Sequence, residues 1–143
     1  SGETASFTWT YVENGTGPGT LLFAAGASGI DAATHAPVIA NPVSTPLIQV
    51  QIPAILEVDS FALPLHLSRG QEFVAIMRVR NLGQATAVDV LPSPNRPLKV
   101  LTGGANASTL TAITPSTIPG GGSAAFTWIY TEDGTGPGSV AIP

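Results

Sequence analysis

The sequence predicts an all-β protein whose antiparallel strands pack as a β-sandwich. Apolar and polar residues alternate with a period of two over most of its 143 residues, the pattern of half-buried strands. The 16 glycines and 13 prolines interrupt this pattern at turns, and no window of ten or more residues shows a helical period free of them. Charged residues make up 10% of the chain, against about 25% in average soluble proteins. Because glycines and prolines interrupt every window with a helical period, we expect almost no helix.

A fifteen-residue motif occurs twice in the chain. The first motif, residues 5–19 (ASFTWTYVENGTGPG), recurs as the second motif, residues 124–138 (AAFTWIYTEDGTGPG), with eleven identical positions at an offset of 119. A repeat of that period corresponds to a whole β domain and not to a turn of a solenoid. With a boundary near Thr45, residues 1–44 are expected to be the closing strands of one domain, or a segment donated to a neighbouring copy. Residues 45–143 are expected to form a sandwich that lacks most of its last strand.

Each motif begins with a predicted strand that has a heavy aromatic inner face. Six residues form this expected aromatic core: Phe7, Trp9, Tyr11, Phe126, Trp128 and Tyr130. The Gly-Thr-Gly-Pro-Gly turn follows, and then a second alternating stretch to Gly29, so these two strands should form a hairpin. Residues 37–46 contain three prolines and suit an edge or connecting segment better than a central strand.

Shorter alternating runs predict the remaining strands. The run around Phe73, Ala75, Met77 and Val79 is the clearest and is expected to be a central strand, although Val74 and Ile76 fall on its outer side. Other strands are expected at residues 47–52, 55–61, 86–90, 98–101 and 109–113.

Two stretches of the sequence, around residues 70–83 and 121–130, follow a pattern found in a known family of surface repeats. A Gly-Gln strand (70–71) leads to an Asn-x-Gly turn (81–83), and a Gly-Gly-Ser approach (121–123) leads into the second aromatic strand; Phe23 and Asp31 supply a Phe-rich strand ending in Gly-x-Asp. Over about 120 residues this pattern is similar to the Ig-like repeats of CARDB type in bacterial and archaeal surface proteins. The resemblance implies an antiparallel Ig-like β-sandwich, a location outside the cell or on its surface, and no shared catalytic residue.

The incomplete sandwich expected at each end of the chain predicts that copies of the chain associate. Either the N-terminal strands of one protomer complete the open sandwich of the next, or the chain is a slice of a polyprotein whose sister repeats are covalently linked. Both arrangements give a filament, stalk or surface coat. The candidate inter-subunit residues are Leu21, Phe23, Ala25, Ala27, Val140 and Ile142. The same residues would also suit an ordinary core.

Little in the sequence indicates catalysis, a cofactor or a metal. The chain has no cysteine, and His35 and His66 lie in separate segments without nearby carboxylates at ligand spacing. Glu57 with Asp59, and Glu132 with Asp133, lack the loop pattern of a calcium site. The five basic residues all fall between Arg69 and Lys99, and the net charge is −4, which disfavours nucleic-acid binding.

The leading expectation is therefore a structural subunit and not an enzyme. The alternative is an adhesin or a carbohydrate-binding accessory module of a large secreted protein, which would contact a surface glycan or another cell-surface protein. No apolar run is long enough for a membrane span. Asn14 and Asn106 lie in sequons and are candidate acceptors of N-glycans in an exported chain.

Overall fold

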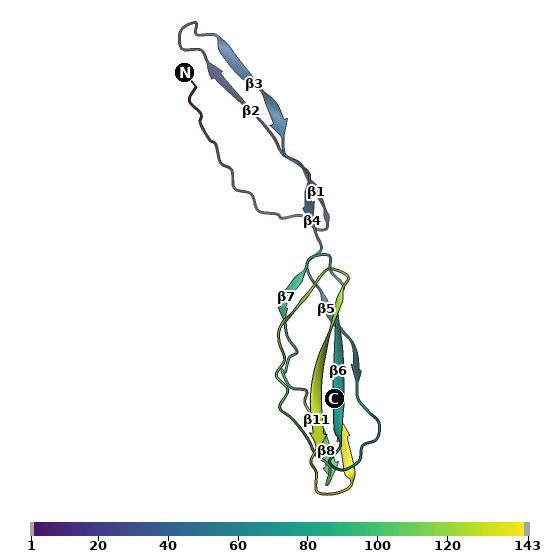
Figure 1. The fold of residues 1–143 in the computed structure, drawn as a ribbon. Helices are drawn as coiled ribbons and strands as arrows, with labels where there is room; N and C mark the ends of the chain where they lie inside the picture. Colours follow the sequence, from purple (N-terminus) through teal and green to yellow (C-terminus); the bar gives the residue numbers. More distant parts are fainter. Residues whose placement is uncertain (1, 142–143) are drawn as a thin grey trace. The chain divides into compact units, whose positions relative to one another are not determined.

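The computed structural model describes residues 2–141, and all of their regular structure is β-strand (Figure 1). Every strand pairing in this part of the chain is antiparallel. The prediction of an all-β antiparallel protein is therefore confirmed. The chain divides into two compact units, Ser1–Val50 and Gln51–Pro143, so the division lies slightly beyond the boundary expected near Thr45.

In residues 2–50, the described part of the first unit, the strands form two short ladders and no buried core. β1 (Gly19–Leu21) pairs with β4 (Ile48–Val50), and β2 (Ala24–Ile30) forms a hairpin with β3 (Pro37–Ser44). All residues described in this unit are exposed except two half-buried ones, Phe23 and Val50. The expected hairpin between the aromatic stretch and the strand after the glycine turn is not formed. The strand β2 pairs instead with β3, the proline-rich segment that was expected at an edge.

Asp31 closes the loop between β2 and β3. Its Oδ1 atom accepts hydrogen bonds from the backbone N–H groups of Ala33 (2.9 Å) and Thr34 (2.7 Å) and from the Thr34 hydroxyl (2.9 Å). The backbone N–H of Asp31 donates to the carbonyl of Ala36 at 2.8 Å, and that of His35 donates back to the carbonyl of Asp31 at 2.9 Å. These bonds define a compact Asx-type turn.

We expect this loop to loosen in acid. The backbone bond from Thr34, then its hydroxyl bond, then the bond from Ala33 hold the pKa of Asp31 below its ordinary value of 3.8. Because the folded-state pKa is lowered, the stabilisation is fully present above pH 3.8 and is lost as the pH falls through the lower folded value. The amide NMR signals of Ala33 and Thr34 should therefore shift together with a midpoint below 3.8. Asp31→Asn should abolish this transition, and a midpoint above 3.8 would contradict the assignment.

The second unit is organised around a four-stranded sheet. Its strand order is β5 (Leu56–Ala62), β6 (Glu72–Asn81), β11 (Ser123–Glu132) and β9 (Ala107–Thr109). The long pair β6–β11 runs in register from Glu72 opposite Thr131 to Arg80 opposite Ser123. The predicted central strand around residues 73–79 therefore lies within β6, between two partners.

Two shorter ladders complete the second unit. β7 (Ala87–Val90) pairs with β10 (Ser116–Ile118), and β8 (Val100–Gly103) pairs with β12 (Gly138–Ala141). The β7–β10 pairing contains a bulge, and the predicted last short strand is shifted from residues 109–113 to β9. Side chains from β7 and β10 contribute to the same core as the four-stranded sheet.

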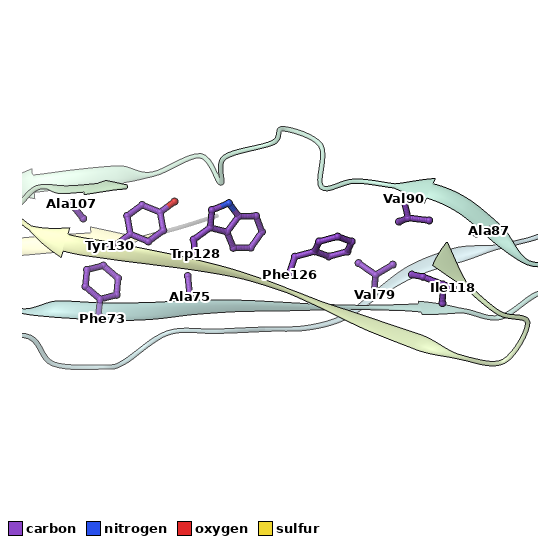
Figure 2. Packing of buried hydrophobic residues seen from close by; sticks show 10 residues of the cluster. All are labelled: Phe73, Ala75, Val79, Ala87, Val90, Ala107, Ile118, Phe126, Trp128 and Tyr130. Carbon is purple, nitrogen blue, oxygen red and sulfur yellow. The ribbon is translucent and has the colours of Figure 1, made fainter. Parts of the chain in front are cut away.

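The core lies on the inner face of β6 and β11, where residues of alternating position point inward. Figure 2 shows its ten buried hydrophobic side chains: Phe73, Ala75, Val79, Ala87, Val90, Ala107, Ile118, Phe126, Trp128 and Tyr130. The largest of them, Trp128, is fully buried and donates its indole N–H to the carbonyl of Asn95 at 3.1 Å. Phe61 packs edge-on against Trp128, and Phe73 stacks on Tyr130 with ring centroids 5.4 Å apart. The strict alternation predicted for this stretch thus gives a continuous aromatic core.

A single fully buried asparagine connects three loops at one end of this core. The Oδ1 atom of Asn81 accepts from the backbone N–H groups of Ile55 (3.1 Å) and Gly83 (3.0 Å). Its Nδ2 atom donates to the carbonyls of Ala85 (2.8 Å) and Ile118 (3.1 Å). The side chain therefore uses its full hydrogen-bonding capacity, which is what makes a buried amide tolerable.

Candidate functional site

The two motifs have very different surroundings, and this difference defines the candidate site. In the second motif, the side chains of Phe126, Trp128 and Tyr130 are 3%, 0% and 4% exposed. They belong to β11, which is held between β6 and β9 by backbone hydrogen bonds on both sides. Residues 124–132 of this motif are therefore part of a strand in a folded domain, paired with β6 along nearly its whole length and with β9 at its C-terminal end.

In the first motif, the equivalent aromatic side chains are in water. Phe7, Trp9 and Tyr11 are 71%, 62% and 67% exposed, and residues 5–14 form no strand. The expectation that these three residues form a core strand differs from the structure. The reason is a missing partner: in the described part of the chain, no strand pairs with this segment, whereas β11 has two. The ring of Tyr11 contacts that of Phe23, with centroids 4.8 Å apart. Among the described residues, this is the one aromatic contact between the first motif and a residue outside it.

The differences between the motifs follow the two faces of β11. All five inward positions of the second motif are retained in the first: Ala124, Phe126, Trp128, Tyr130 and Glu132 correspond to Ala5, Phe7, Trp9, Tyr11 and Glu13. Four of the five outward positions differ: Ala125, Ile129, Thr131 and Asp133 correspond to Ser6, Thr10, Val12 and Asn14. The first motif therefore carries the complete side-chain pattern that fills the core of the second unit.

The glutamate of each motif shows which hydrogen bonds form within the motif and which need residues from elsewhere in a folded domain. Glu132 is buried, and its carboxylate accepts from the backbone N–H groups of Gly134 (3.0 Å), Gly70 (3.2 Å) and Asn106 (3.5 Å). Glu13 is exposed and makes the equivalent local bond, from the N–H of Gly15 at 2.6 Å. The described residues give Glu13 no counterpart of the two long-range bonds. The turn thus has the same local geometry in both motifs, without its long-range partners in the first.

The glycine turns lead to the same conclusion. A Cβ atom added at Gly138 would lie 2.0 Å from the carbonyl oxygen of Thr102, so only glycine fits there. At the equivalent Gly19, an added Cβ would meet no atom within 4 Å. The second glycine turn is packed against β8, and the first has space around it.

The candidate inter-subunit residues lie in both units. Leu21 is on β1, Ala25 and Ala27 are on the exposed strand β2, and Phe23 is half-buried between these strands. Val140 is on β12 and packs, partly buried, against the core of the second unit. Ile142 lies outside the described residues. The structure therefore leaves the β1–β2 residues largely accessible and gives Val140 an internal contact.

The remaining candidate residues have structural contacts or are exposed. Asn14 is exposed, whereas Asn106 is half-buried, and its Oδ1 atom accepts from the Lys99 ammonium group at 2.9 Å. Asp59 forms an ion pair with Arg80 at 3.5 Å, and Asp133 accepts from the Ser108 hydroxyl at 2.6 Å.

The described residues bring no cluster of catalytic or metal-ligating side chains together. Residues 2–141 contain no group of three or more histidine or carboxylate side chains placed to hold a metal ion. A hollow of about 580 Å³ lies between the 64–69 loop and β12, with Arg69 and Glu132 in its wall. The carboxylate of Glu132 is already bonded to three backbone N–H groups. The hollow therefore has no paired acid and base of the kind that general acid–base chemistry needs.

Sequence reasoning missed the role of Asn81. It was read only as part of an Asn-x-Gly turn, because its partners lie up to 37 positions away in the chain. Its signal in the sequence is a polar residue at an inward position of an otherwise apolar strand face.

Comparisons with protein-family models, with curated proteins and with solved structures found no match for this chain. Among the described residues, no helix is long and apolar enough to cross a membrane.

Proposed function

We propose that this chain is a structural subunit or repeat of an extracellular filament, stalk or surface coat. In this proposal its body is an Ig-like β-sandwich, and copies join head-to-tail by β-strand complementation. The observation that carries the proposal is the first motif, which keeps every inward residue of β11 yet exposes its rings to water. Exposed apolar residues on an unpaired segment favour pairing with another chain.

The first unit as a whole supports self-association. It has strands, and none of its residues from 2 to 50 is buried; its exposed apolar side chains include Ile30, Ile39 and Val43 at 72%, 80% and 76%. A single two-stranded hairpin is at best marginally stable in water, so this unit needs another surface for stability. The low charge of the chain favours association of such surfaces over solubility as monomers.

The test uses Trp9 as a reporter in the full chain. In Trp128→Phe, Trp9 is the one remaining tryptophan. Its emission should shift to the blue as concentration rises, in parallel with growth of the sedimenting species, because a ring that enters an interface leaves water. The matched variant Trp9→Phe should assemble without an equivalent shift from the already buried Trp128. A chain that remains monomeric at the highest soluble concentration would overturn the proposal.

The same exposed rings favour one alternative, a carbohydrate-binding or adhesive module. Aromatic side chains exposed on a surface are a usual platform for sugar rings, and Phe7 and Trp9 lie with centroids 6.5 Å apart. Ala5 and Glu13, which the first motif also retains, have no role in such a platform. In the strand β11, the corresponding Ala124 packs against the core and Glu132 bonds backbone N–H groups. Titration of the Trp9 reporter with glycans at a concentration where the chain is monomeric distinguishes the two functions.

A further inference from the structure

The exposed first motif contains the one Asn-Gly pair of the sequence, at Asn14 and Gly15. Both residues are exposed, and residues 5–14 form no strand. Because glycine has no Cβ atom, its backbone nitrogen can approach the preceding side chain with little steric hindrance. The residues that follow the other asparagines of the sequence are all larger: Pro42, Leu82, Arg96 and Ala107. The side-chain amide of Asn14 is therefore the one most open to attack by the next backbone nitrogen.

A carboxylate already contacts the proton that this attack must remove. The backbone N–H of Gly15 donates to Oε1 of Glu13 at 2.6 Å. A general base acts from about 2.6–3.2 Å, measured between the heavy atoms that share the proton. In the second motif, the corresponding carboxylate of Glu132 also accepts from Gly70 and Asn106, whereas the described residues give Glu13 no such further partner. Glu13 is therefore placed to take the proton of the Gly15 nitrogen.

The packed copy of the motif has a different residue at this position. Asp133 corresponds to Asn14, and its carboxylate accepts from the Ser108 hydroxyl at 2.6 Å. Its backbone N–H donates to the carbonyl of Asn106 at 3.3 Å. An aspartate has no amide to lose, and its carboxylate is a poorer electrophile than the amide of asparagine. The reactive pair is thus present in the exposed motif and absent from the sequence of the packed one.

We propose that Asn14 is a self-modifying site, converted through a cyclic imide to aspartate and isoaspartate. The Glu13 carboxylate takes the proton of the Gly15 nitrogen, which forms a bond to Cγ of Asn14. The bond from Cγ to Nδ2 breaks, and Nδ2 leaves as ammonia with that proton. Water then opens the ring at either of its two carbonyl carbons. Opening at Cγ gives aspartate, and opening at the backbone carbonyl carbon gives isoaspartate, in which the main chain runs through the side chain.

Isoaspartate at this position has a consequence for assembly, which rests on the proposed function. It adds one carbon to the main chain between residues 14 and 15. At the equivalent place in the second motif, the backbone is tightly packed: a Cβ atom added at Gly134 would lie 2.2 Å from the carbonyl oxygen of Gly104. A first motif with a longer main chain does not fit surroundings of that kind. Modified molecules should therefore assemble less than unmodified ones.

The test follows the full-length chain in dilute neutral buffer, after production in a host that adds no N-glycans. Mass spectrometry of chymotryptic peptides measures the loss of each asparagine amide, and labelling by protein isoaspartyl methyltransferase measures isoaspartate. We expect Asn14 to be converted before any loss is detected at Asn106. Glu13→Gln should slow the conversion by about tenfold or more, because it removes the base. Glu3→Gln, the same change at another exposed glutamate of the first unit, is the matched control and should leave the rate unchanged.

The outcomes separate this inference from the proposed function. A persistent Asn14 amide, or equal loss at Asn106, would overturn the site, and equal rates in Glu13→Gln and Glu3→Gln would overturn the role of Glu13. Sedimentation of the fully converted chain is compared with that of Asn14→Gln after the same incubation, since a longer amide side chain does not form the five-membered ring. Equal assembly of the two would overturn the consequence for assembly. Failure of fresh chain to assemble would overturn the proposed function, whereas amide loss in dilute solution would still establish the site.

Discussion

Trp128→Ala is expected to lower the free energy of unfolding of the second unit by about 3–5 kcal/mol, the usual range for removal of a large aromatic side chain from a core. Trp128 is fully buried, contacts Phe61 and donates to the carbonyl of Asn95. The loss includes the cavity that remains, because β6 and β11 are held in register on both sides of it. Urea unfolding followed by circular dichroism measures this change.

The first motif provides a matched control within the same chain. Trp9 has the same neighbours Thr8 and Phe7 on its N-terminal side that Trp128 has in Thr127 and Phe126, yet it is 62% exposed. In dilute solution, where molecules are separate, Trp9→Ala should change the stability of the second unit by no more than about 0.5 kcal/mol. Equal effects of the two substitutions would contradict the different environments of the motifs. At assembling concentration, Trp9→Ala is expected to weaken association instead.

The alternation of residues was enough to predict the strands that have partners. β6 and β11 follow the predicted period, because each inward residue meets a core that the other strand shares. The same period at Phe7, Trp9 and Tyr11 gave no strand, since alternation indicates which face would be buried and cannot supply the strand that pairs with it. The two motifs have nearly the same sequence and hence nearly the same local preference for a strand. Only the second forms one, so the difference comes from long-range pairing.

The candidate site was predictable in part for the same reason. The repeat could be recognised from the sequence, but the meaning of its differences became clear only when burial assigned them to the outward face of β11. The pairings of β2 with β3 and of β7 with β10 could not be predicted, because they depend on which segments meet in the folded chain. The hydrogen bonds of Asn81 were likewise hidden, since they join segments far apart in the chain.

Asn81→Ala is expected to destabilise the second unit by about 3 kcal/mol, although it removes a small polar side chain. The substitution leaves two backbone N–H groups, at Ile55 and Gly83, and two carbonyls, at Ala85 and Ile118, without their partner. Each buried polar group left unsatisfied costs about 1–3 kcal/mol, and water that reaches the more exposed loops recovers part of this.

Gln84→Ala is the matched control for this prediction. Gln84 holds the same loop region through one exposed bond, from the backbone N–H of Ile52 to its Oε1 atom at 3.0 Å. Its removal should cost no more than about 1 kcal/mol, because water can replace the bond. Urea unfolding of both variants gives the comparison, and hydrogen exchange at Gly83 reports the local effect. If Asn81→Ala were no more destabilising than Gln84→Ala, the three loops would be fixed by the backbone bonds around Asn81 and not by its side chain.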